Sequence, residues 1–172
     1  YLFDPNPNLK IKNFTYFPIG IGDSKKIINF NLNNYFPSSG SSMNTLIKND
    51  IMWQISRKII TFNFFGKFTK IKVKQDTLDN FVKKNQIPKI DILKIDTEGH
   101  ELKVLYGAKK ILKKTKIIQL EILERKEKFN KKSEKILKFL NSYGFTLIIR
   151  KNIWSVGIFS NIKSNELLFV KK

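Results

Sequence analysis

The residues best suited to chemistry gather at one point of the chain, where an apolar run ends in Asp96, Glu98, Gly99 and His100. The run itself, Ile90–Ile95, is typical of a buried strand, and an amphipathic helix is predicted directly after the acidic residues. In open α/β sheets, ligands bind in the crevice outside the carboxyl ends of the strands. The order of strand, acidic tip and helix therefore predicts a functional site at this edge of a sheet.

The side chains of this acidic tip could carry out acid–base catalysis. A carboxylate or an imidazole removes a proton from a hydroxyl group when it lies within hydrogen-bond reach. We expect Asp96 to serve in the site, whereas Glu98 could equally well cap the following helix together with Glu101. His100 is the only histidine of the chain. An unperturbed histidine has a pKa of ~6.5, and a helix start disfavours its charged form, so His100 could be the base or could have a structural or substrate-side role.

A further carboxylate, Glu121, interrupts a second apolar run at residues 117–123. A buried carboxylate is unfavourable unless it is paired. We therefore expect Glu121 either to face the mouth of the site or to contact a cation such as Lys94. Asp96, Glu98 and Glu121 could together hold a divalent metal through oxygen ligands, but we predict no metal site.

Several further elements must position this tip. Apolar periodicity and turn signals predict strands that alternate with helices, followed by two closely spaced strands. This order favours an α/β fold with a mostly parallel sheet, helices on both faces and an antiparallel pair at the C-terminal edge. Helices are expected after Thr77 and at residues 101–114 and 133–143. Strands are expected at residues 1–3, 14–21, 26–32 (paired with 14–21 as a hairpin), 58–65, 69–73, 90–95, 117–123, 145–149 and 167–170, with a further candidate at 154–159.

The composition is that of one domain, and we expect residues 1–172 to form it. Apolar residues make up 41% of the chain and include 15 Phe, so a packed core is predicted. Cysteine is absent, which excludes disulfides and thiolate metal sites. The net charge of +19 would attract nucleic acid or an anionic membrane, but the lysines are scattered, and we favour a solvated surface. No run approaches the roughly 20 apolar residues of a membrane span, and we expect a cytoplasmic protein.

Three segments resemble the FkbM-type methyltransferase family: Asp4-Pro5-Asn6-Pro7 after a strand, Thr77-Leu78-Asp79 before a helix, and the stretch from Leu93 to Glu101. Leu105-x-Gly107-Ala108 and Gln119-Leu120-Glu121-Ile122 continue this resemblance, which runs from Asp4 to about Ile122. It implies a Rossmann-like fold that uses S-adenosylmethionine, typically to methylate a hydroxyl group of a sugar, a glycan or a small molecule. It also implies an earlier strand that ends in a glycine-rich turn, and both are missing before Tyr1. We therefore expect an N-terminally truncated methyltransferase domain that is inactive alone.

The resemblance also implies roles for particular residues. Asp4 would follow a Rossmann-type second strand, where a carboxylate binds the ribose hydroxyls of the cofactor. Gly22 and Asp23 would contact the adenine, although a plain turn is as good an interpretation. The catalytic candidates are the groups of the acidic tip and its neighbouring strand: Asp96, Glu98, His100 and Glu121.

Two other functions remain open at this point. The positive charge favours a nucleic-acid methyltransferase, but Asp96–Gly99 lacks the aromatic residue needed to stack a flipped base. Asp4-Pro5-Asn6-Pro7 imitates the required element but follows the wrong strand. A non-catalytic binding module that keeps the fold is the third possibility, because the glycine-rich turn is missing. We expect a hydroxyl-bearing small molecule or glycan as the partner, rather than nucleic acid.

Overall fold

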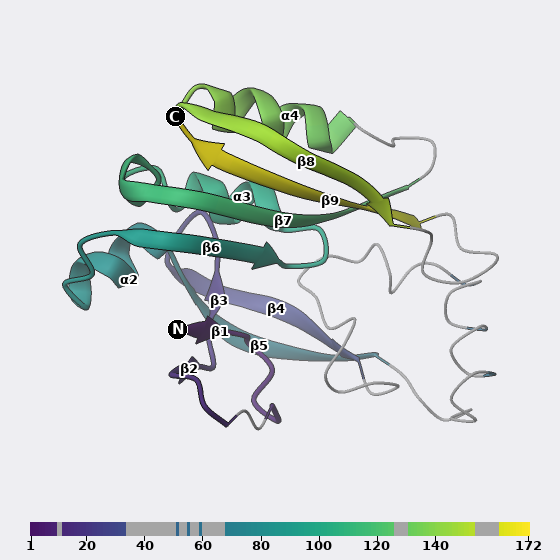
Figure 1. Cartoon of the computed structure of the whole chain (residues 1–172). Coiled ribbons are helices and arrows are strands. Elements are labelled where there is room, and N and C mark those ends of the chain that lie inside the picture. Colours follow the sequence, from purple (N-terminus) through teal and green to yellow (C-terminus); the bar gives the residue numbers. More distant parts are fainter. Residues whose placement is uncertain are drawn as a thin grey trace.

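The computed structural model describes residues 1–9, 12–33, 68–125, 131–153 and 162–172, together with Ile51, Ile55 and Ile59. Within these residues the chain is a mixed α/β structure whose strands form three sheets (Figure 1). The α/β class predicted from the sequence is therefore confirmed. The elements are β1 (Leu2–Phe3), β2 (Tyr16–Phe17), β3 (Gly20–Ile21), β4 (Lys26–Asn33), β5 (Phe68–Asp76), α2 (Leu78–Lys84), β6 (Ile90–Asp96), α3 (Glu101–Tyr106), the 3₁₀ turn η1 (Ile111–Lys114), β7 (Thr115–Arg125), α4 (Lys131–Asn141), β8 (Phe145–Ile153) and β9 (Ile162–Lys171).

The largest sheet carries the acidic tip and has the strand order β6-β7-β9-β8. Strands β6 and β7 are parallel, whereas β9 is antiparallel to both β7 and β8. The antiparallel C-terminal pair predicted from the sequence is thus confirmed, with β8 at the edge. Pairing of β6 with β7 sets Asp96 beside Glu121. Asp96 is the last residue of β6, whereas Glu121 lies within β7, which continues to Arg125.

The N-terminal strands pair differently from the prediction. Residues 14–21 form two short strands, β2 and β3, on either side of Pro18, whose missing N–H cannot join a ladder. Strand β4 pairs antiparallel with β5 rather than with β3, and β3 joins the other edge of β5 in parallel. The predicted hairpin of residues 14–21 and 26–32 is therefore wrong. One mostly parallel sheet was expected, but the described strands form three sheets: a parallel pair, β1 and β2, and two mixed sheets.

Two predicted strands concern residues that the structure describes little or not at all. Residues 154–159 lie outside the described residues. Of residues 58–65 only Ile59 is described, and it is helical.

Helix α2 begins as predicted, because the Thr77 hydroxyl accepts a hydrogen bond from the backbone N–H of Asn80 at 3.1 Å. It buries Leu78, Phe81 and Val82. The ring of Phe81 packs edge-on against Phe3 and Phe17, with centroid distances of 4.6 and 4.8 Å. This aromatic cluster ties the short strands β1 and β2 to α2, and it thereby places the residues that follow β1.

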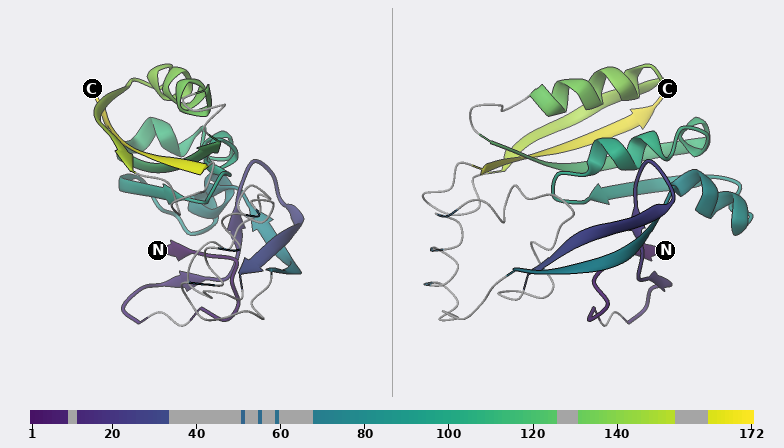
Figure 2. Two further views of the ribbon diagram at one scale, coloured as in Figure 1. Left: turned by 90° about the vertical axis from the view of Figure 1, so that its right-hand side faces the viewer. Right: turned by 180° about the vertical axis from the view of Figure 1, so that it is seen from behind.

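The helix predicted at residues 101–114 is divided into α3 and η1 at Gly107. A Cβ at residue 107 would overlap the carbonyl oxygen of Gly22, so only glycine permits this close approach of two backbones. The apolar stripe of the predicted helix is still buried through Leu105, Ala108 and Leu112. Figure 2 shows α3 and α4 together on one face of the large sheet. Packing, rather than periodicity, therefore determines where the helix ends.

Strand β6 is more exposed than its apolar sequence predicted. Ile95 is buried, but the side chain of Ile92 is 66% exposed. Within the described residues β6 pairs only with β7, so its other edge is open. An open edge presents unpaired N–H and C=O groups. The exposure of Ile92 shows that the expectation of a strand covered on both faces is wrong for β6.

Among the described residues, no helix combines the length and the apolar character that crossing a membrane would require.

Candidate functional site

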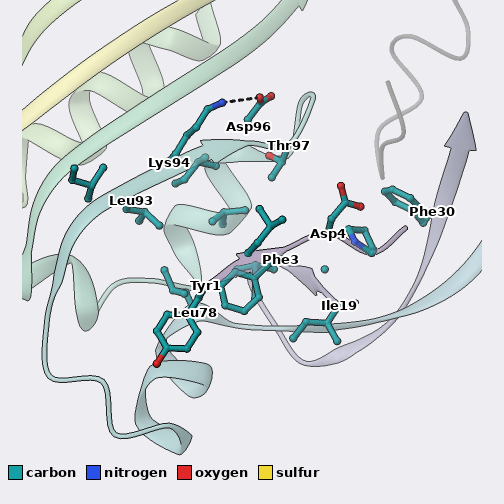
Figure 3. Close-up of a pocket in the computed structure, with 17 residues that line it drawn as sticks. Tyr1, Phe3, Asp4, Ile19, Phe30, Leu78, Leu93, Lys94, Asp96 and Thr97 are labelled. Carbon is teal, nitrogen blue, oxygen red and sulfur yellow. Dashed lines mark ion pairs between the residues drawn. The ribbon is translucent and has the colours of Figure 1, made fainter. Parts of the chain in front are cut away.

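A pocket of about 470 Å³ lies between β1 and the open edge of β6 (Figure 3). Its apolar walls include Phe3, Ile19 and Leu78, and its polar groups lie just after the two strands. Asp4 follows β1, while Asp96 and Thr97 end β6. The residues that line it are Tyr1, Leu2, Phe3, Asp4, Pro5, Ile19, Gly20, Ile21, Phe30, Leu78, Ile92, Leu93, Lys94, Ile95, Asp96, Thr97 and Val104.

Asp4 is held in a well-defined turn. Its Oδ1 accepts the backbone N–H of Asn6 at 2.8 Å, and the hydroxyl of Tyr16 donates to the carbonyl oxygens of Asp4 and Asn6 at 2.9 and 2.6 Å. Burial raises the pKa of the Asp4 carboxyl, and the hydrogen bond from Asn6 partly offsets this effect. Among the described residues no donor contacts Oδ2. The carboxylate is therefore fixed in place while one of its oxygens can accept a ligand.

Asp96 forms the other polar end of the pocket. Its carboxylate turns toward the ammonium group of Lys94, at 3.5 Å (Figure 3). The neighbouring Glu121 accepts a hydrogen bond from the Ser164 hydroxyl at 3.1 Å and does not line the pocket. Burial, and then the charge of Asp96, raise the pKa of Glu121. Of the two carboxylates, only Asp96 lines the pocket; the Lys94 ammonium pairs with Asp96, and its charge also acts to lower the pKa of Glu121.

The loop after Asp96 has an unusual backbone. Glu98 and Gly99 have φ angles of 49° and 113°, both in the region that disfavours side chains. Glu98 and His100 do not line the pocket. Instead the buried carboxylate of Glu101 accepts the backbone N–H of Gly99 at 2.7 Å and the hydroxyl of Thr97 at 3.2 Å. Glu101 is therefore the residue that holds the loop, a role that its position at a predicted helix start did not reveal.

His100 is half-buried at the start of α3, and its Nε2 has no hydrogen-bond partner among the described residues. Burial lowers the pKa of His100 to about 4, and the positive charge of Lys103 acts in the same direction. The charges of Glu101 and Asp23 oppose this shift. The imidazole is consequently neutral at pH 7 and a weaker base than an ordinary histidine. This favours a structural role over that of the general base.

We predict that His100 makes the free energy of unfolding fall as the pH falls from ~6.5, the pKa in the unfolded chain, toward the folded value of about 4. In that window the unfolded chain binds a proton that the folded chain does not, so protonation favours unfolding. Urea unfolding of the wild type and of His100→Gln at pH 7 and pH 5 measures the effect. The variant is expected to lose less stability between the two pH values, and identical losses would contradict the prediction.

Gly22 and Asp23, the residues expected to contact adenine, are not brought to this pocket. Asp23 lies in the turn between β3 and β4, where its carboxylate pairs with Lys26 at 3.2 Å. It lines a separate depression between α2 and η1. Gly22 packs against Gly107, and the Gln75 side chain occupies the space that a Cβ would need. The structure therefore favours the plain-turn interpretation that the sequence left open.

Sequence reasoning missed Lys94 and Thr97 as lining residues and Tyr16 as the support of Asp4, and it considered Glu101 only as a cap of the following helix. Lys94 could have been found, because residues two apart on a strand share a face and Lys94 precedes Asp96 by two. Tyr16 and Glu101 gave no such signal, because their partners are set by packing. No group of acidic or histidine side chains within the described residues is arranged to hold a metal ion.

Comparison with known proteins gives one family. Residues 1–147 match the family described as "Methyltransferase FkbM domain". No curated protein and no solved structure matches the chain.

Proposed function

Because the chain belongs to the FkbM methyltransferase family, we propose that it acts as an S-adenosylmethionine-dependent O-methyltransferase on a hydroxyl group of a sugar, a glycan or a small molecule. One observation carries the proposal: Asp4 and Asp96, which lie far apart in the sequence, line the same pocket. The sequence resemblance gave these residues complementary roles, one toward the cofactor and one toward the acceptor.

The pocket has the properties that a nucleoside cofactor requires. Ligand sites commonly have volumes of roughly 300–1,000 Å³, with apolar walls and a few polar groups that fix orientation. The pocket of about 470 Å³ falls in this range, and Phe3, Ile19 and Leu78 supply apolar walls. The second oxygen of the Asp4 carboxylate is available to accept a ribose hydroxyl. We therefore assign Asp4 to the cofactor.

S-adenosylmethionine would supply an electrophilic methyl group on its sulfonium. The acceptor oxygen forms a bond to that methyl carbon as the bond from carbon to sulfur breaks, and the hydroxyl proton must leave. We assign its removal to the carboxylate of Asp96, because a general base must lie within hydrogen-bond reach of the proton. The ammonium group of Lys94 lies 3.5 Å from this carboxylate.

The experiment measures cofactor affinity in a version of the chain extended upstream of Tyr1. Isothermal titration calorimetry is expected to show binding of S-adenosylmethionine, and Asp4→Ala is expected to raise the dissociation constant by about 10- to 100-fold. This range follows from the loss of a charge-assisted hydrogen bond of about 1.5–3 kcal/mol.

Asp76→Ala is a matched control, because Asp76 also ends a strand but does not line the pocket. Its affinity for the cofactor is expected to equal that of the wild type. Equal affinities of wild type and Asp4→Ala would remove Asp4 from the cofactor site. An extended chain that binds no S-adenosylmethionine would refute the proposed function itself.

A further inference from the structure

Glu101 joins the acidic tip to the C-terminal helix. The residue is completely buried, and its carboxylate receives donors from both sides. Oε1 accepts the backbone N–H of Gly99 and the hydroxyl of Thr97, while Oε2 accepts the ammonium group of Lys132 in α4. A buried carboxylate is tolerated when a cation and hydrogen bonds satisfy it. Glu101 and Lys132 therefore form an ion pair between α3 and α4, in which the carboxylate is fully buried and the Lys132 side chain is 22% exposed.

The loop that this ion pair holds would not keep its shape unaided. Glu98, a residue with a side chain, and Gly99 both have positive φ angles, of 49° and 113°. Such conformations persist only where the surrounding structure determines them. The bond from Gly99 to Glu101 is 2.7 Å long and is strengthened by the charge of the carboxylate. Figure 2 shows α3 and α4 side by side on one face of the large sheet, which allows Lys132 to reach this carboxylate.

We propose that Glu101 and Lys132 are a positioning pair that sets the geometry of the acidic tip for methyl transfer, an inference that rests on the proposed function. Neither residue lines the pocket, so neither is a catalytic residue. The pair acts through Thr97, which lines the pocket, and through Gly99, which fixes the loop directly after Asp96. The first turn of α4 is thus part of the support of the site.

Three variants separate positioning from mere stability. Lys132→Met leaves the Glu101 carboxylate buried without its cation. Glu101→Gln keeps an oxygen for Gly99 but turns an amide toward Lys132. The double variant Glu101→Gln/Lys132→Met removes both charges and keeps that oxygen, so it is expected to be closer to the wild type than Lys132→Met is. Lys135→Met is the control, because Lys135 is exposed on the same helix and has no bond to Glu101.

The first readout is the amide proton signal of Gly99 in NMR spectra of the chain, which reports directly on its hydrogen bond. Lys132→Met is expected to shift this signal, the double variant to return it toward the wild-type position, and Lys135→Met to leave it unchanged.

The second readout is turnover by the upstream-extended enzyme. Lys132→Met is expected to lower kcat by about 10- to 100-fold, because a misplacement of about 1 Å has effects of this size. The dissociation constant of S-adenosylmethionine is expected to change by no more than about twofold, as for distant, independent sites.

The outcomes distinguish this inference from the proposed function. If the wild type is active, an unchanged Gly99 signal and kcat in Lys132→Met would overturn the positioning pair. Equal losses of kcat in Lys132→Met and in the double variant would also overturn it, because they would indicate general destabilisation. If the wild-type enzyme neither binds the cofactor nor turns over, the proposed function is refuted. The Gly99 signal then decides alone whether the pair holds the loop.

Discussion

Asp96→Ala is expected to lower kcat of the upstream-extended enzyme by about 10²- to 10⁴-fold, the usual contribution of a general base. The expectation follows from the position of Asp96 at the end of β6, where its carboxylate lines the pocket beside Lys94. Cofactor affinity is expected to be retained, because the proposed ribose contact, Asp4, follows β1 and not β6. Steady-state turnover and calorimetric binding of S-adenosylmethionine measure the two quantities separately.

A matched control lies on the same strand. Asp91 is 60% exposed, pairs with Lys116 at 2.8 Å and does not line the pocket. Exposed ion pairs contribute little to stability, so Asp91→Ala is expected to keep the wild-type kcat. A small effect of Asp96→Ala, equal to that of Asp91→Ala, would move the catalytic role away from Asp96. Glu121→Gln would then become the next variant to measure, because Glu121 is the neighbouring carboxylate in register.

The largest effect on stability is expected for Gly107→Ala. The new Cβ would overlap the carbonyl oxygen of Gly22 and lie 3.0 Å from its carbonyl carbon. Neither backbone can move easily, because Gly22 donates to the Asp76 carbonyl and the Gly107 carbonyl accepts from Asp79, both at 2.9 Å. Overpacking of this kind costs typically 1–3 kcal/mol and occasionally more; we expect about 3 kcal/mol. Tm should then fall by roughly 6–12 °C in thermal unfolding followed by circular dichroism.

Gly144 provides the contrast, because it is required for another reason. Its φ angle is 83°, and an added Cβ would meet no atom within 4 Å. Gly144→Asn is therefore expected to be nearly neutral, since asparagine tolerates this conformation. Gly107→Asn should be at least as harmful as Gly107→Ala. A Tm of Gly107→Ala within about 2 °C of the wild type, less than 1 kcal/mol for a chain of this size, would contradict the close packing of the two glycines.

The local elements that flank the site could be predicted from the sequence with few errors. Strands β6 and β7 and helices α2 and α4 lie where apolar periodicity and capping residues placed them. These features depend on neighbours a few residues away, so the signals that specify them are contained in short segments. The position of Asp96 at a strand end followed directly from them.

Errors arose where contacts between distant segments decide the outcome. The partner of β4 proved to be β5 rather than β3, and the long helix ended early at Gly107 because Gly22 approaches it. Neither the pairing of β4 nor the end of this helix can be inferred from the local periodicity of the sequence. Strand pairing and close packing depend on which surfaces meet in the folded chain.

The sequence by itself determined which side chains stand at the ends of strands and helices, including the acidic residues around Asp96, because their neighbours in the chain encode these local structures. Only the tertiary structure decided that Asp4 shares a pocket with Asp96, that the turn at Asp23 does not reach it, and that Glu101 is neutralised by Lys132. The physical reason is that a buried charge or a shared pocket needs groups from separate segments, and their approach is set by the packing of the whole core.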